Sequence, residues 1–246
     1  LVEGEYAAKI GTTGEADGYK VNVYALRNKD DEKKDPTATD PVTLGDNDLY
    51  GSLQSLRELL TEEGEYASKD DIDNVDGNAA SKRGIPYYIN QLDSLARTFA
   101  EEMNKLNMPN DGTGNPPLDG EGALFETNDN TTDITAGNIC ISQEWAEGTV
   151  KMLSTTDPNA PTDDRSNLAQ FLNLFNRKDI EFDPKDIVGD AEGAVYEGSF
   201  EGMLLRIEST LAQDQMAATT TLNNYAITLD NVYTDRDSVT GVDLND

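Results

Sequence analysis

The feature that most constrains the fold is a long apolar seam near the C-terminal end of the sequence. Apolar residues recur there at every third or fourth position from Leu204 to Val232, a spacing that places their side chains on one face of a helix. Two successive steps of four residues around Gln215 depart from a strict heptad and indicate a straighter stretch. We therefore predict a helix from about Phe200 to near Arg236 with these seam residues: Leu204, Ile207, Leu211, Leu222, Tyr225, Leu229 and Val232.

A second seam begins at Ile85-Pro86 and ends before Met108-Pro109. Proline is favoured in the first turn of a helix because an N–H there has no intrahelical partner. A seam of this kind packs along another helix, so both seams are candidate packing and assembly surfaces. The second seam consists of Ile85, Ile89, Leu92, Leu95, Phe99, Met103 and Leu106.

The other apolar residues lie in shorter runs. The runs 5–10, 19–26, 134–141 and 180–182 indicate strands, and Ser166 is the candidate cap of a short helix. Two long helices separated by β-rich material predict an α+β fold, with an elongated long-helix bundle stem and one or two inserted β-rich domains. We predict four regions: a β-rich segment at 1–48, the first part of the helical stem at 49–108, a mixed β-rich domain with one short helix at 109–197, and the long C-terminal stem helix with a following turn at 198–246.

The sequence contains no histidine. This excludes Ser-His and Cys-His nucleophile systems and His-based metal sites. The single cysteine, Cys140, has no disulfide partner within the chain. The net charge of −29 repels nucleic acids and anionic membranes. We therefore expect no nucleic-acid or membrane partners and assign no catalytic, cofactor or metal residues, although carboxylate-only or Lys-based chemistry stays open.

Two acidic features leave alternatives open. The run from Asp70 to Gly77 does not match an EF-hand, because the positions that need Gly and Glu hold Asp76 and Lys82. A looser calcium loop stays open beside the interpretation as a solvated loop. With 48 acidic residues in the chain, a carboxylate pair at the separation used by glycosidases also stays open.

Two blocks of sequence resemble a known family. The first combines Gly-Ser-Leu-Gln-Ser-Leu-Arg-Glu-Leu at 51–59 with Ile-Pro-Tyr-Tyr-Ile-Asn-Gln-Leu-Asp-Ser-Leu-Ala at 85–96. The second is Arg-Asp-Ser-Val-Thr-Gly-Val-Asp-Leu-Asn-Asp at 236–246. Together they resemble the central and C-terminal part of the flagellar hook-associated protein 1 family, which forms the hook–filament junction. Residues 163–165 and an apparent insertion at 69–77 depart from the family pattern, and residues 1–48 match it weakly.

The resemblance implies a structural component of the bacterial flagellum that is secreted through the flagellar export channel and located outside the cell. Such subunits form a ring at the distal end of the hook and adapt it to the filament. The implied partners are the hook protein, the second hook–filament junction protein, copies of the chain itself, and an export chaperone that binds regions outside this chain. The alternative hypothesis is an extracellular adhesin or glycan-binding module, which a concave aromatic patch in the β-rich part would favour.

Overall fold

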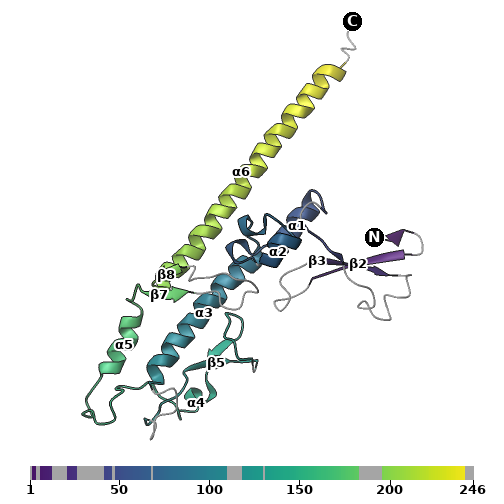
Figure 1. Ribbon diagram of the computed structural model, residues 1–246. Coiled ribbons are helices and arrows are strands. Elements are labelled where there is room, and N and C mark those ends of the chain that lie inside the picture. The colour runs from purple at the N-terminus through teal and green to yellow at the C-terminus, as the bar shows by residue number, and fades with distance from the viewer. Residues whose placement is uncertain are drawn as a thin grey trace. The chain divides into compact units, whose positions relative to one another are not determined.

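The computed structural model describes residues 2–3, 6–12, 21–26, 42–45, 48–67, 69–109, 118–129, 131–182 and 196–241. The chain divides into two compact units, Leu1–Met203 and Leu204–Asp246, which are described separately (Figure 1).

An antiparallel four-stranded sheet occupies the N-terminal part of the first unit. Its strands are neighbours in chain order: β1 (Val2–Glu3), β2 (Tyr6–Thr12), β3 (Val21–Leu26) and β4 (Val42–Thr43). In the longest pairing, Ala7 lies opposite Leu26 and Thr12 lies opposite Val21. The alternation of polar and apolar residues predicted strands at 5–10 and 19–26, and β2 and β3 confirm both.

Helix α3 (Ile85–Asn107) is the central element of the rest of the first unit, and shorter elements from both sides of it in the sequence pack against it. It begins as predicted, with Pro86 in its first turn, and Met108 is its C-terminal cap. Several short elements contact it, of which α1 (Ser52–Thr61) and the 3-10 turn η3 (Gly64–Tyr66) precede it in sequence. Between η3 and α3 in the sequence lie the helix α2 (Lys69–Asn74) and the 3-10 turn η4 (Ala79–Ser81), which contact each other.

The part of the first unit after α3 consists of short elements. Two hairpin-like pairs of strands form here, β5 (Phe125–Thr127) with β6 (Ile139–Ile141), and β7 (Ile180–Phe182) with β8 (Tyr196–Gly198). Two helices separate them: α4 (Gln143–Ala146) and α5 (Ser166–Leu174). The helix predicted at Ser166 and the strand predicted at 180–182 are therefore confirmed.

An aromatic network joins these short elements to α3. Phe99 of α3 lies edge-to-face against Phe125 and Phe200, with ring centroids 5.2 and 5.7 Å apart. Trp145 packs against Phe125 at 5.8 Å, and Phe182 against Phe200 at 5.5 Å. Edge-to-face pairs of this kind add to the free energy gained by burying the rings, so this network is a substantial part of the core of the first unit.

The second unit is one helix. Helix α6 (Phe200–Thr240) begins in the first unit and supplies all the described residues of the second except Gly241. Figure 1 shows it as a single continuous helix, coloured green to yellow. The prediction of a long C-terminal helix is confirmed, and the helix continues past Arg236 to Thr240. In the block that resembles the junction family, residues 236–240 therefore belong to the helix, and 242–246 lie outside the described residues.

The structure contradicts the predicted fold class of an elongated long-helix bundle with inserted β-rich domains. The chain is mainly helical, but no second long helix packs along α3 within the described residues. The elements with the most extensive contacts to it are the short helices α1 and α5, a 3-10 turn and strands of three residues. After residue 108 the described strands form only two two-stranded sheets. The seam spacing specified a helix but not its neighbour, because helices are stabilised by whichever tertiary partner covers their apolar face.

Candidate functional site: an exposed helical face and a buried ion cluster

Most of the predicted seam of α6 is exposed. Near the start of the helix, Leu204 is exposed and Ile207 is buried. The other five seam residues keep more than half of their surface accessible: Leu211, Leu222, Tyr225, Leu229 and Val232. These five side chains form a surface that a partner is able to bind, and we call it the α6 face.

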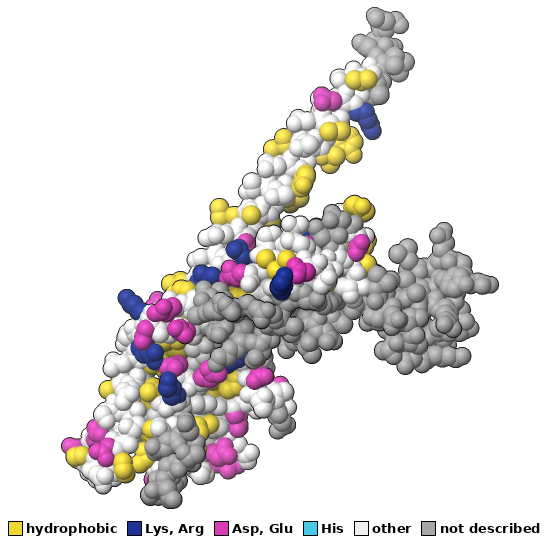
Figure 2. Space-filling view, viewed as in Figure 1, with side chains coloured by type: hydrophobic (Ala, Val, Ile, Leu, Met, Phe, Trp, Pro, Cys, Tyr) yellow, Lys and Arg dark blue, Asp and Glu magenta, His cyan; other side chains and the backbone are white. Residues whose placement is uncertain are grey.

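The α6 face is straight, and three of its five residues, Leu222, Tyr225 and Leu229, lie in an uncharged part of the helix. Successive helical residues are about 100° apart, so Leu211, Leu222 and Leu229 fall within roughly 20° of one another. Figure 2 shows hydrophobic side chains along this helix with few charged ones between them. From Gln215 to Leu229 the sequence has no charged residue, although the chain as a whole carries a net charge of −29.

The polar side chains of α6 bind their own helix. The hydroxyls of Thr219, Thr220 and Thr228 each donate to the carbonyl four residues earlier, at 2.8 Å. Threonine is a weak helix former, and this back-bonding slightly destabilises a helix. Because most helical stability in proteins comes from packing an apolar face, burial of the α6 face would stabilise a helix of this composition.

The predicted seam of α3 is divided between exposed and buried residues. Ile85 and Leu92 are exposed, and Met103 is buried. The remaining members are half-buried: Ile89, Leu95, Phe99 and Leu106. The most buried residues of α3 include several polar ones that no seam prediction named: Tyr87, Gln91, Ser94 and Asn107.

In helix α1 the usual placement of polar residues outside and apolar residues inside is reversed even more clearly than in α3. Its only buried residue is Arg57, whereas its leucines are exposed at Leu53, Leu56, Leu59 and Leu60. Contiguous exposed apolar residues mark interaction surfaces. The α1 leucines therefore form a second candidate surface, which lies in the first unit.

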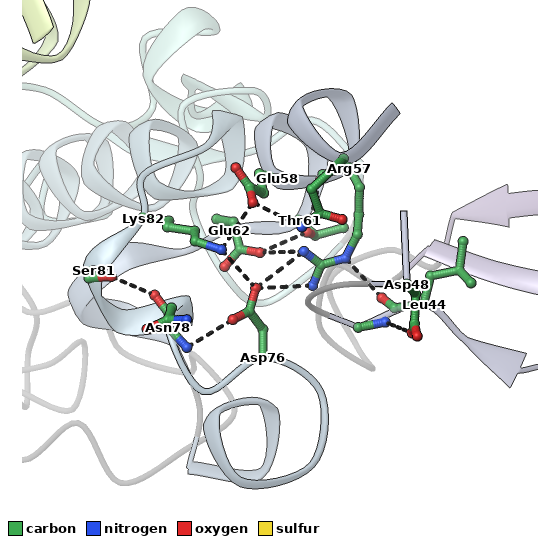
Figure 3. Close-up of polar contacts among 12 residues, drawn as sticks. Leu44, Asp48, Arg57, Glu58, Thr61, Glu62, Asp76, Asn78, Ser81 and Lys82 are labelled. Carbon is green, nitrogen blue, oxygen red and sulfur yellow. Dashed lines mark hydrogen bonds and ion pairs between the residues drawn. The ribbon is translucent and has the colours of Figure 1, made fainter. Parts of the chain in front are cut away.

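Arg57 is buried because its guanidinium binds oxygens from three segments of the chain (Figure 3). Its Nε donates to the carbonyl of Leu44, just after β4, at 2.9 Å. Its Nη1 donates to Oε1 of Glu62 at 3.0 Å and to Oδ2 of Asp76 at 3.2 Å. The side chains of all three charged residues are only 2% exposed. The cluster therefore links the exit of β4, the end of α1 and the turn after α2.

The two carboxyl groups bound by Arg57 ionise in different pH ranges. Burial and the neighbouring Asp76 raise the pKa of Glu62 to about 7, in spite of the opposing effect of Arg57. Burial also disfavours the ionised form of Asp76, but hydrogen bonds from the Asn78 N–H and from Glu62, together with Lys82, outweigh it and lower its pKa. Glu62 is therefore the group of the pair that holds a proton.

Three asparagines, for which no role was predicted, fasten irregular segments to the C-terminal half of α3. Asn107 and Asn167 are buried, and Asn104 is half-buried. The side chain of Asn107 donates to the carbonyls of Gly122 and Lys151 and accepts from the N–H of Leu153, all within 3.0 Å. The only sequence signal was the occurrence of two asparagines, which are poor helix formers, near the end of a strongly periodic helix.

An open cavity of about 280 Å³ lies beside α3 and the start of β7. Arg177 on its wall forms ion pairs with Glu102 and Asp179. The ion pairs hold Glu102 and Asp179 in contact with Arg177 on its wall, and we assign no reaction to it. Among the described residues, no group of three or more candidate ligands is placed to hold a metal ion.

The proposed calcium loop stays a prediction. The side chains of Asp70 and Asp71 lie outside the described residues, and Asp76 is bound by Arg57. No helix in the described part of the chain combines the length and apolar character needed to cross a membrane.

The chain matches no known protein family, no curated protein and no solved structure. Its function must therefore be inferred from its own residues and surfaces.

Proposed function

We propose that the chain is a structural component of the bacterial flagellum that helps to form the junction between hook and filament by self-association and helix packing. The exposed α6 face carries this proposal, together with the resemblance of blocks 51–59, 85–96 and 236–246 to the junction family. In this role the protein lies outside the cell and catalyses no reaction. It contacts the hook protein, the second junction protein and copies of itself.

Burial of the α6 face supplies the free energy of association. Complete burial of one Leu, Val or similar side chain contributes about 1.5–3 kcal/mol relative to exposure. The α6 face holds five such residues, each more than half exposed, so its burial contributes on the order of 5 kcal/mol before the costs of ordering. A modest contact suffices in a ring, because every subunit is held by neighbours on two sides.

The distribution of charge favours contact at the α6 face over contact elsewhere. Two copies with a net charge of −29 each repel one another over most of their surface. The uncharged interval from Gln215 to Leu229 is a place where the two helices approach without placing like charges side by side. Repulsion elsewhere then restricts association to this register.

A pull-down of the purified chain with hook protein and with the second junction protein tests the proposal. The variant L222D/L229D places two charges on the α6 face, and we expect at least tenfold weaker binding. The matched control is N224D/N231D, which adds the same charges at the same spacing about 200° around the helix. We expect the control to bind within twofold of the unaltered protein.

The cellular half of the test is the motility of a strain that lacks the gene. Loss of filaments, restored by the unaltered gene and by N224D/N231D but not by L222D/L229D, would support the junction role. Normal swimming together with no binding would contradict it. In that case, arrays of glycans would test the adhesin alternative.

A further inference from the structure

The buried guanidinium of Arg57 is a polar centre shared by three segments of the chain. The carbonyl of Leu44, the carboxylate of Glu62 and the carboxylate of Asp76 all accept from it, at 2.9–3.2 Å. The Leu44 bond is made through Nε, whereas both carboxylates share Nη1 and Asp76 also accepts from Nη2 at 3.4 Å. A change in the carboxylate pair therefore acts on the segment after β4 through one rigid, planar group.

The charges around this centre do not balance when every group is ionised. Lys82 contributes the second positive charge, and its Nζ lies 3.0 Å from Glu58 and 3.4 Å from Asp76. Two cations thus face three carboxylates, counting Glu62. Of the nearby charged residues, Glu63 is also buried, and it pairs with Arg83 through a backbone bridge. One bound proton neutralises the excess negative charge in a site where the side chains of Arg57, Glu62 and Asp76 are only 2% exposed.

We propose that the Glu62–Asp76 pair is a pH-sensitive latch: while it holds one proton, it keeps Arg57 bound to the Leu44 carbonyl, and loss of that proton releases the segment that follows β4. The latch does not depend on the flagellar role proposed above, since it rests on contacts within the first unit.

The proton acts by removing competition for Arg57. With Glu62 protonated, Arg57 faces one buried carboxylate, and the Glu62 hydroxyl donates to Asp76. With both groups ionised, two carboxylates that share Nη1 repel each other at low dielectric. The elevated pKa of Glu62, about 7 against an ordinary 4.5, agrees with this geometry. The bound proton stabilises the closed form fully below pH 4.5, and this contribution is lost as the pH rises to about 7.

Amide hydrogen exchange of the full chain between pH 5 and pH 8, corrected for the intrinsic exchange rate, tests the latch. We expect the protection of the amides of residues 42–45 and of Asn78 and Gly84 to fall about tenfold per pH unit up to pH 7 and then to level off, as linkage to one proton requires. In E62Q the neutral amide replaces the protonated carboxyl, so protection should not vary with pH over this range.

Two controls keep the outcome decisive. The variant E101Q removes one exposed carboxylate from α3 and should behave as the unaltered protein does. Difference infrared spectra of the unaltered protein between pH 5.5 and pH 8 should show the loss of one buried protonated carboxyl group, a measurement that stays available even if E62Q does not fold. Constant protection of the amides of residues 42–45 between pH 5 and pH 7, or no change in the infrared spectra, would overturn the proposal.

Discussion

Helices α3 and α6 carry apolar residues at the same spacing, yet Met103 of α3 is buried, whereas Leu222 of α6 is 67% exposed. The difference lies in what the surrounding sequence provides. Side chains at the end of α3 bind the backbone of segments far along the chain, as Asn107 binds Gly122 and Lys151. Three threonines of α6, Thr219, Thr220 and Thr228, donate instead to carbonyls of their own helix.

An apolar seam is often taken to imply both that a helix forms and that the same chain buries its apolar face. Helices α3 and α6 show that these are separate properties. The spacing determines that a helix forms with one apolar face. Whether its own chain covers that face depends on polar anchors that hold loops and short strands against it. In the first unit such anchors are present, and the core forms. In the second unit the apolar face stays available to a partner.

The largest expected effect is the loss of Arg57, a buried polar anchor of the first unit that binds three segments of the chain. The variant R57L leaves two buried carboxylates without their shared cation. Removal of one partner from a buried ion pair typically costs about 3–5 kcal/mol. We expect the free energy of unfolding, measured by urea denaturation with Trp145 fluorescence, to fall by this amount.

Two matched variants sharpen this test. L53A alters an exposed residue of the same helix and should change the free energy of unfolding by about 0.5 kcal/mol or less. The triple variant R57L/E62Q/D76N removes the uncompensated charges as well, so it should recover much of the loss. If the triple variant were as unstable as R57L, unpaired charge would not be the cause.

The second effect concerns the polar anchors of α3. N107A leaves the carbonyls of Gly122 and Lys151 and the N–H of Leu153 without their partner, and each buried unsatisfied group costs about 1–3 kcal/mol. We expect a loss of roughly 3 kcal/mol in urea denaturation. N176A is the matched control, because its side chain is exposed and makes one local hydrogen bond, and it should cost about 0.5 kcal/mol or less.

These anchors also show where prediction from sequence ends. The helices at 85–107 and 200–240 follow from local spacing and from Pro86, because helix formation depends on residues within a few turns. The burial of Arg57 does not follow, since it requires Asp76, 19 positions away. The usual pattern of polar and apolar residues predicts arginine at the surface and leucine in the core. In α1 the arginine is buried instead, because its ion pairs with Glu62 and Asp76 stabilise it there.

The predicted bundle failed for the same physical reason. The seam of α3 was expected to meet another long helix, but loops held by Asn104 and Asn107 and the ring of Phe125 occupy its sides. A single asparagine that binds loop backbone has no periodicity, so no pattern in the sequence reveals it. The exposed α6 face, by contrast, is one of the two seams that the sequence named as candidate assembly surfaces.

The third effect is a pH dependence confined to the first unit. The folded-state pKa of Glu62 is about 7, raised from 4.5, so its contribution to stability is complete below pH 4.5 and is lost as the pH rises to 7. At about 1.4 kcal/mol per pH unit for one proton, the free energy of unfolding should fall by up to roughly 3 kcal/mol over this window. E62Q should lack this component, so the difference between the two urea titration series isolates Glu62 from the other carboxylates.

The smallest expected effect is on the α6 face itself. L222A shortens a side chain that is already 67% exposed, so it removes little buried surface and should change the unfolding of the first unit by about 0.5 kcal/mol or less. M103A shortens a buried residue of the α3 seam and creates a cavity, so it should lower the free energy of unfolding by about 2–5 kcal/mol. Trp145 reports on both variants, because it packs against Phe125 in the first unit. Equal losses in L222A and M103A would mean that the α6 face is covered within the chain itself, and the case for an external partner along it would be lost.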